Sequence, residues 1–152
     1  MIDFDFSRAA TWLTHLSLAY ALSLPIGWDR EKVSRSAGIR TFPLIAVSAC
    51  AFVLMASSLS NQGSDSSSLA RVFQGVVTGL GFLGGGVILK NKNRVMGMST
   101  AAAIWLTGAL GVSCGLRYYE TAIVLSIVCF LSLRYGKVVK GKNGDDEVDE
   151  DC

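Results

Sequence analysis

The side chains best suited to chemistry lie in a charged segment that follows the first apolar run of the chain. Asp29 and Glu31 stand there among four cationic residues. Carboxylate oxygens are ligands that Mg²⁺ prefers, usually with several waters retained. Asp29 is therefore a candidate metal ligand, and the alternative is that these charges are simply solvated at the end of a helix. Because no Asp or Glu lies within an apolar run away from its ends, we expect no high-affinity magnesium site inside a membrane that a single chain builds.

The sequence gives no sign of an enzyme. It contains no nucleophile paired with a base, no cluster of metal-ligating residues and no phosphate-binding loop. The run GLGFLGGG looks like a dinucleotide motif, but no strand precedes it and no acidic residue follows about 20 positions later. The four cysteines form no CxxC pair, so we expect them to have packing roles. We predict neither catalysis nor a bound cofactor.

His15 is the one ionisable side chain that falls deep within an apolar run. An ionisable group inside a membrane is by default a candidate for a functional site. The alternative is a neutral histidine that forms a hydrogen bond to a neighbouring helix. The sequence leaves both interpretations open.

Long apolar segments must position these residues. Hydrophobic residues make up 51% of the chain and charged residues only 17%. A helix needs about 20 apolar residues to cross a bilayer, and five segments approach this length. We therefore predict an all-α fold, a polytopic membrane helix bundle of about five transmembrane helices. These segments span residues 10–27, 41–59, 72–89, 99–116 and 119–135.

The basic residues predict how these segments are oriented. Most of the 14 Lys and Arg residues fall in the first and third loops and after the last segment. Positive loops stay in the cytoplasm, so we predict a cell-membrane protein with its N-terminus outside and its C-terminus inside. Residues 1–136 would form the transmembrane domain. Residues 137–152, first basic and then acidic, would form a disordered cytoplasmic tail.

Glycines concentrate in the third and fourth segments. In lipid, small residues four apart let helices approach closely, so Gly75 with Gly79 and Gly81 with Gly85 predict close packing. The alternative is that residues 84–86 interrupt the helix and leave backbone groups at a cavity, as in the broken helices of transporters. Both interpretations place a glycine-rich hairpin at the centre of the bundle. Ser99 and Thr100 are expected to cap the helix that follows.

Three stretches of the chain, in this order and spacing, resemble the MgtC/SapB family of membrane proteins. They are IGWDREKVSRSAGIRTFPLIAVSA, GVVTGLGFLGGGVILK and VMGMSTAAAIWLTGALGVSCGLRYY. The family usually has Glu-Arg after its first helix, where this chain has Asp-Arg. The resemblance implies functional roles for the residues that match the motifs. They are Gly27, Asp29, Arg30, Gly38, Arg40, Thr41, Gly79, Gly81, Phe82, Gly84, Gly86, Thr100, Ala101, Trp105 and Gly111.

The resemblance also implies an inner-membrane protein that helps the cell to cope with low magnesium. One hypothesis is a regulator that docks onto a second copy or onto another membrane protein through its glycine-bearing faces. The alternative is a transporter or channel component that carries magnesium or another small ion along a glycine-lined pathway. Expected partners are therefore membrane lipids, a homo-oligomer or another membrane protein, and magnesium itself, with no nucleic acid. Many family members carry a soluble C-terminal domain, which this chain is expected to lack.

Overall fold

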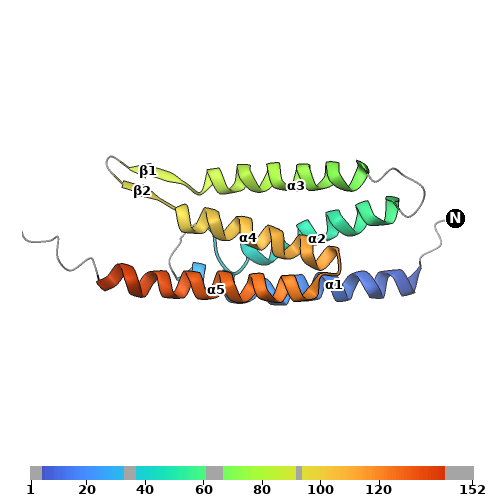
Figure 1. The fold of residues 1–152 in the computed structure, drawn as a ribbon, viewed down its shortest axis with the longest axis horizontal. Helices are drawn as coiled ribbons and strands as arrows, with labels where there is room; N and C mark the ends of the chain where they lie inside the picture. Colours follow the sequence, from blue (N-terminus) through green and yellow to red (C-terminus); the bar gives the residue numbers. More distant parts are fainter. Residues whose placement is uncertain (1–4, 33–36, 61–66, 92–93, 143–152) are drawn as a thin grey trace, which may run out of the picture.

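The computed structural model describes residues 5–32, 37–60, 67–91 and 94–142. Five helices lie side by side along one long axis, and a short antiparallel hairpin projects at one end (Figure 1). The helix α1 begins at one end of the bundle and α5 finishes at the other. The elements are α1 (Phe6–Glu31), α2 (Thr41–Ser60), α3 (Ser67–Gly86), β1 (Leu89–Asn91), β2 (Arg94–Met96), α4 (Met98–Gly115) and α5 (Tyr119–Lys142).

The helix α4 forms the centre of the bundle. It packs against each of the other four helices, and 11 of its 18 residues are buried. The helix α3 lies along one side, while α1 and α5 pack together on the opposite side (Figure 1). Only Leu80 and Gly84 are buried among the 20 residues of α3. The core therefore surrounds α4, and α3 remains largely exposed.

The first helix is longer than predicted. It begins at Phe6, directly after the capping residue Asp5, whose side chain accepts a hydrogen bond from the Arg8 N–H at 3.1 Å. It continues through Pro25 to Glu31. A proline removes one backbone donor from a helix and disturbs the preceding turn. The Ser126 hydroxyl of α5 donates to the Leu22 carbonyl in that turn at 2.6 Å. Because α1 continues, the charged motif lies in its last turns.

The glycine run does not break α3. Residues 84 and 85 are helical, and the helix ends at Gly86, so the predicted interruption is wrong. The chain then forms the hairpin, in which Leu89 pairs with Met96 and Lys90 pairs with Val95. The segment predicted as a simple turn of an all-α protein thus contains two short strands.

Gly97, and not Ser99 or Thr100, precedes the first residue of α4. Its φ of +90° lies in the left-handed region, which glycine adopts without steric cost. A Cβ here would also overlap the Val87 carbonyl oxygen. No side chain caps α4, so the predicted cap is wrong. The positive φ and the nearby Val87 carbonyl therefore exclude a residue with a side chain at position 97.

Among the described residues, two helical segments are long and apolar enough to cross a membrane. They are Thr41–Leu59 and Met98–Gly115, which match two of the predicted segments closely. Core helices of soluble proteins can have the same length and composition. The helix α5 continues past residue 135 to Lys142. Residues 143–152 of the predicted tail lie outside the described residues.

Candidate functional site

A buried ion pair occupies the last turns of α1. The Nη2 of Arg30 donates to Oδ2 of Asp29 at 2.6 Å. Asp29 is 7% exposed and Arg30 only 3%. The alternative prediction, that these charges are solvated at the end of a helix, is therefore wrong for this pair. Burying a charge is costly unless an opposite charge and hydrogen bonds compensate for it. The pair therefore acts first as a structural unit, in which each residue makes the burial of the other tolerable.

The turn before α2 packs against the end of α1 next to this pair. The exposed Glu31 side chain accepts a hydrogen bond from the Ile39 N–H through Oε2 at 2.9 Å. The N–H groups of Thr41 and Phe42 donate to the Gly38 carbonyl at 3.0 and 3.2 Å. These bonds tie the end of α1 to the start of α2, although residues 33–36 between them lie outside the described residues.

Two motif glycines make this packing sterically allowed. A Cβ at Gly27 would lie 3.0 Å from the Cα of Ile39, and one at Gly38 would collide with the Glu31 carboxylate. Both positions are buried. The first motif therefore forms one packed corner. Cys129 of α5 lies near it, close enough for its thiol to interact electrostatically with Arg30 and Asp29.

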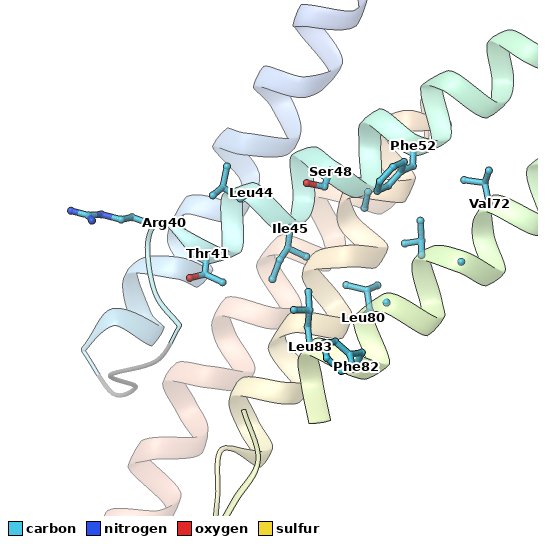
Figure 2. Close-up of a pocket in the computed structure, with 14 residues that line it drawn as sticks. Arg40, Thr41, Leu44, Ile45, Ser48, Phe52, Val72, Leu80, Phe82 and Leu83 are labelled. Atoms are coloured by element: carbon cyan, nitrogen blue, oxygen red, sulfur yellow. The ribbon is translucent and has the colours of Figure 1, made fainter. Parts of the chain in front are cut away.

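An apolar groove of about 770 Å³ runs between α2 and α3 (Figure 2). Arg40 stands at the N-terminal end of α2, and its side chain extends away from the groove. Asp29 and Arg30 do not line it. The lining residues are Arg40, Thr41, Leu44, Ile45, Ser48, Ala49 and Phe52 from one side, and Val72, Gly75, Val76, Gly79, Leu80, Phe82 and Leu83 from the other.

Four glycines of α3, two in the groove and two outside it, have no close neighbour. A Cβ at Gly75, Gly79, Gly85 or Gly86 would meet no atom within 4 Å. The spacing of these glycines predicted close helix contacts, and within this single chain they make none. The open glycines of α3 therefore leave a surface, and not a helix interface, on the monomer.

The matching residues on the inner side of α3 do pack. A Cβ at Gly84 would lie 3.6 Å from the indole ring of Trp105 and 3.8 Å from the Cβ of Ala101, and one at Gly81 would lie 4.0 Å from Trp105. Thr100 and Ala101 are buried in the first turn of α4. Phe82 instead points outward and is 82% exposed. The second and third motifs thus meet where α3 crosses α4.

The glycines of α4 are the close-packed ones. A Cβ at Gly111 would overlap the carbonyl oxygen of Ala46, and one at Gly108 would overlap the Leu80 side chain. At Gly115, an added Cβ would lie 2.9 Å from the Cys50 carbonyl oxygen. Small residues that let backbones approach are typical of membrane helix contacts. Gly111 and Gly115 bring α2 against the central helix, and Gly108 brings α3 against it.

His15 joins α1 to α5. Its Nε2 lies 2.9 Å from the Tyr119 hydroxyl, and its Nδ1 lies 2.6 Å from the Thr11 carbonyl oxygen. A neutral ring with the proton on Nδ1 satisfies both partners, because Nδ1 then donates to the carbonyl and Nε2 accepts from the hydroxyl. The residue is 4% exposed. His15 thus has the hydrogen bond to a neighbouring helix that the packing interpretation expects.

Among the described residues, no group of three His, Cys, Asp or Glu side chains could hold a metal ion. Asp29 already forms its ion pair with Arg30. The structure therefore provides nothing that strengthens Asp29 as a metal ligand.

The sequence analysis named Glu31 in the charged segment without giving it a role, and it did not single out Ser126. Glu31 belongs to the same charged run as Asp29, so its position two residues further along α1 was the available signal. Ser126 gave no signal, because a lone serine in an apolar helix indicates no partner. Only the packing of α5 against α1 reveals its bond to Leu22.

Comparisons with known proteins agree with the motifs. The MgtC family model matches residues 16–142. An uncharacterized protein of Synechocystis is 38% identical over 79% of this chain and 50% of its own length. Protein MgtC of Salmonella typhimurium is 35% identical over 77% of this chain and 48% of its own length. Protein MgtC of Brucella abortus is 40% identical over 74% of this chain and 45% of its own length.

The chain spans about half the length of these relatives. No solved structure matches it. The matched residues include α2, α3, α4 and α5, most of α1, and the corner, groove and glycine contacts described above. With this extent of similarity, the chain belongs to the MgtC family.

Proposed function

We propose that this chain is a multi-pass protein of the bacterial inner membrane that acts in adaptation to low magnesium by docking onto a second copy or another membrane protein. The observation that carries the docking role is the exposed α3, which has open glycines at residues 85 and 86 outside the groove. A helix that buries two of its 20 residues has most of its surface available to a partner. Small residues on that surface allow a partner helix to approach closely.

The exposed surface supports the membrane placement. The outer ridge of α5 exposes Ile123, Val124, Ile127, Val128 and Leu131. Soluble monomers rarely expose contiguous apolar patches of this kind. Lipid would cover such a ridge without cost.

The arrangement of the basic residues supports the proposed orientation. The start of α2 with Arg40, the hairpin with Lys90 and the last turns of α5 with Arg134 lie at one end of the bundle (Figure 1). The positive-inside rule assigns that end to the cytoplasm. The N-terminus of α1 is then outside.

The buried corner argues against an ion pathway through Asp29. Its carboxylate is 7% exposed, is paired with Arg30, and does not line the groove. An ion in transit would have to replace that salt bridge. We therefore favour docking over transport.

Photo-crosslinking in intact cells tests the docking role. A photoreactive residue replaces Thr78, which is exposed on α3, and a matched one replaces Val124, which is exposed on α5. We expect a protein adduct from position 78 that is several-fold stronger at low magnesium than the adduct from position 124. Equal adducts from both positions, or none, would contradict the proposal. Magnesium flux into liposomes that is abolished by Asp29→Asn would favour the transporter instead.

A further inference from the structure

The groove between α2 and α3 combines an apolar interior with a positive end. We propose that it binds one anionic phospholipid of the cytoplasmic leaflet, with an acyl chain between the helices and the phosphate near Arg40. The inference rests on the membrane placement and orientation proposed above. It assigns the groove to lipid and leaves the outer face of α3, which carries Thr78 and Gly85, to a protein partner.

The walls of the groove suit a hydrocarbon chain. Leu44, Ile45 and Phe52 line it from α2, and Val76 and Leu80 line it from α3. Gly75 and Gly79 add no side chain, so the wall of α3 is low where they lie. The volume of about 770 Å³ falls in the range of roughly 300–1,000 Å³ that is usual for small-molecule pockets. A flexible chain fits such a slot without a specific polar partner.

The length of the groove distinguishes a lipid from a partner helix. On α2 the lining extends from Thr41 to Phe52, which at 1.5 Å per residue is about 17 Å. One leaflet contributes half of the roughly 30 Å hydrocarbon core. The groove is therefore about one leaflet deep, whereas a spanning helix of a partner would need contact along twice that length. An acyl chain matches this depth.

Arg40 is the basic residue among those that line the groove, and it supplies the charge that selects the headgroup, although its side chain extends away from the groove in the structure. Arg40 is exposed at the cytoplasmic end, and its side chain reaches outward from the start of α2 (Figure 2). The first turn of α2 contains no acidic residue. The Glu31 carboxylate lies beside the turn that precedes α2, where its Oε2 accepts the Ile39 N–H. Basic residues at the cytoplasmic ends of membrane helices attract anionic headgroups.

Native mass spectrometry of the purified full chain tests the site. The protein in mild detergent is equilibrated with equal amounts of phosphatidylglycerol and phosphatidylethanolamine that carry identical acyl chains. We expect one phosphatidylglycerol per chain, preferred about fivefold, because one arginine near the surface adds about that much affinity for an anionic lipid. Arg40→Gln should remove the preference. Arg134→Gln, which changes an exposed arginine of α5 outside the groove, should keep it.

A second pair of variants tests the position of the acyl chain. Gly79→Leu should fill the groove and lower the retention of both lipids, whereas Gly85→Leu, equally open but outside the groove, should not. Both replace glycine with a better helix former, and circular dichroism would verify that each variant is folded.

Three outcomes would overturn the lipid site. They are equal retention of both lipids by the unsubstituted chain, an undiminished preference in Arg40→Gln, and a dimer that disappears with Gly79→Leu while no lipid is retained. The last outcome would assign the groove to a second copy. Crosslinking from position 78 reports on docking separately, so the lipid site and the proposed function can fail independently.

Discussion

Helices α3 and α4 carry glycines at similar spacing, but these glycines face different surroundings. On α4, an added Cβ at Gly108 or Gly111 would overlap Leu80 or the Ala46 backbone. On α3, an added Cβ at Gly75 or Gly79 would meet nothing within 4 Å. The same residue type thus brings two helices together inside the bundle and leaves a groove on its surface. Glycine spacing alone does not identify an interface within the monomer.

The comparison extends to the rest of the molecule. The packed side includes the Asp29–Arg30 ion pair and the contact between His15 and Tyr119. The Nε of Arg30 is buried there without a hydrogen-bond partner among the described residues. The open side consists of α3 and the groove. Substitutions on the packed side should cost folding free energy, and those on the open side should not.

The largest effect is expected at the ion pair. Asp29→Leu leaves Arg30 buried without its opposite charge, which should cost about 3–5 kcal/mol. The yield of monodisperse protein in mild detergent and its unfolding midpoint would both fall. The double variant Asp29→Leu with Arg30→Met should recover much of the loss, because an apolar pair replaces the charges. A single variant as stable as the parent would contradict the structural role of the pair.

Gly111→Ala should cause the next largest loss of folding free energy. The new methyl group meets the Ala46 carbonyl, and overpacking of this kind costs about 1–3 kcal/mol. Thermal unfolding in detergent, followed by circular dichroism, measures the shift. If the midpoint does not change, then α2 and α4 are not in the close contact described.

Tyr119→Phe should have a smaller effect. It removes the hydroxyl that pairs with His15, and a hydrogen bond of this type contributes about 1 kcal/mol. Tyr118→Phe is the matched control, because that residue is adjacent and exposed. The difference between the two unfolding midpoints isolates the contact, and equal midpoints would show that it contributes nothing.

Gly79→Ala should change the folding free energy least, and it should stabilise the protein where the other substitutions destabilise it. The methyl group meets no neighbour, and alanine favours a helix over glycine by up to about 1 kcal/mol. The unfolding midpoint should therefore stay the same or rise. A clear fall would mean that α3 packs more closely than described, and the contrast with α4 would be lost.

Much of the architecture was predictable because local composition encodes it. The apolar runs predicted α2 and α4 nearly to the residue, since their ends coincide with Pro43 after Thr41 and with the glycines that flank α4. The hairpin, in which Lys90 pairs with Val95, was missed because each of its strands has only three residues, too few for a recognisable alternation of apolar and polar residues. The motif residues were predicted, but their grouping into a corner, a groove and a helix crossing was not.

The sequence by itself determined that five helices form, where charges and glycines fall along them, and to which family they belong. These are properties of neighbouring residues. Only the tertiary structure decided which charges are buried and which glycines are covered. Asp29 and Arg30 are buried and form their ion pair where the last turns of α1 pack within the bundle. Gly111 is covered and Gly79 is open because α2 lies on one of them and not on the other, and that depends on residues far apart in the chain.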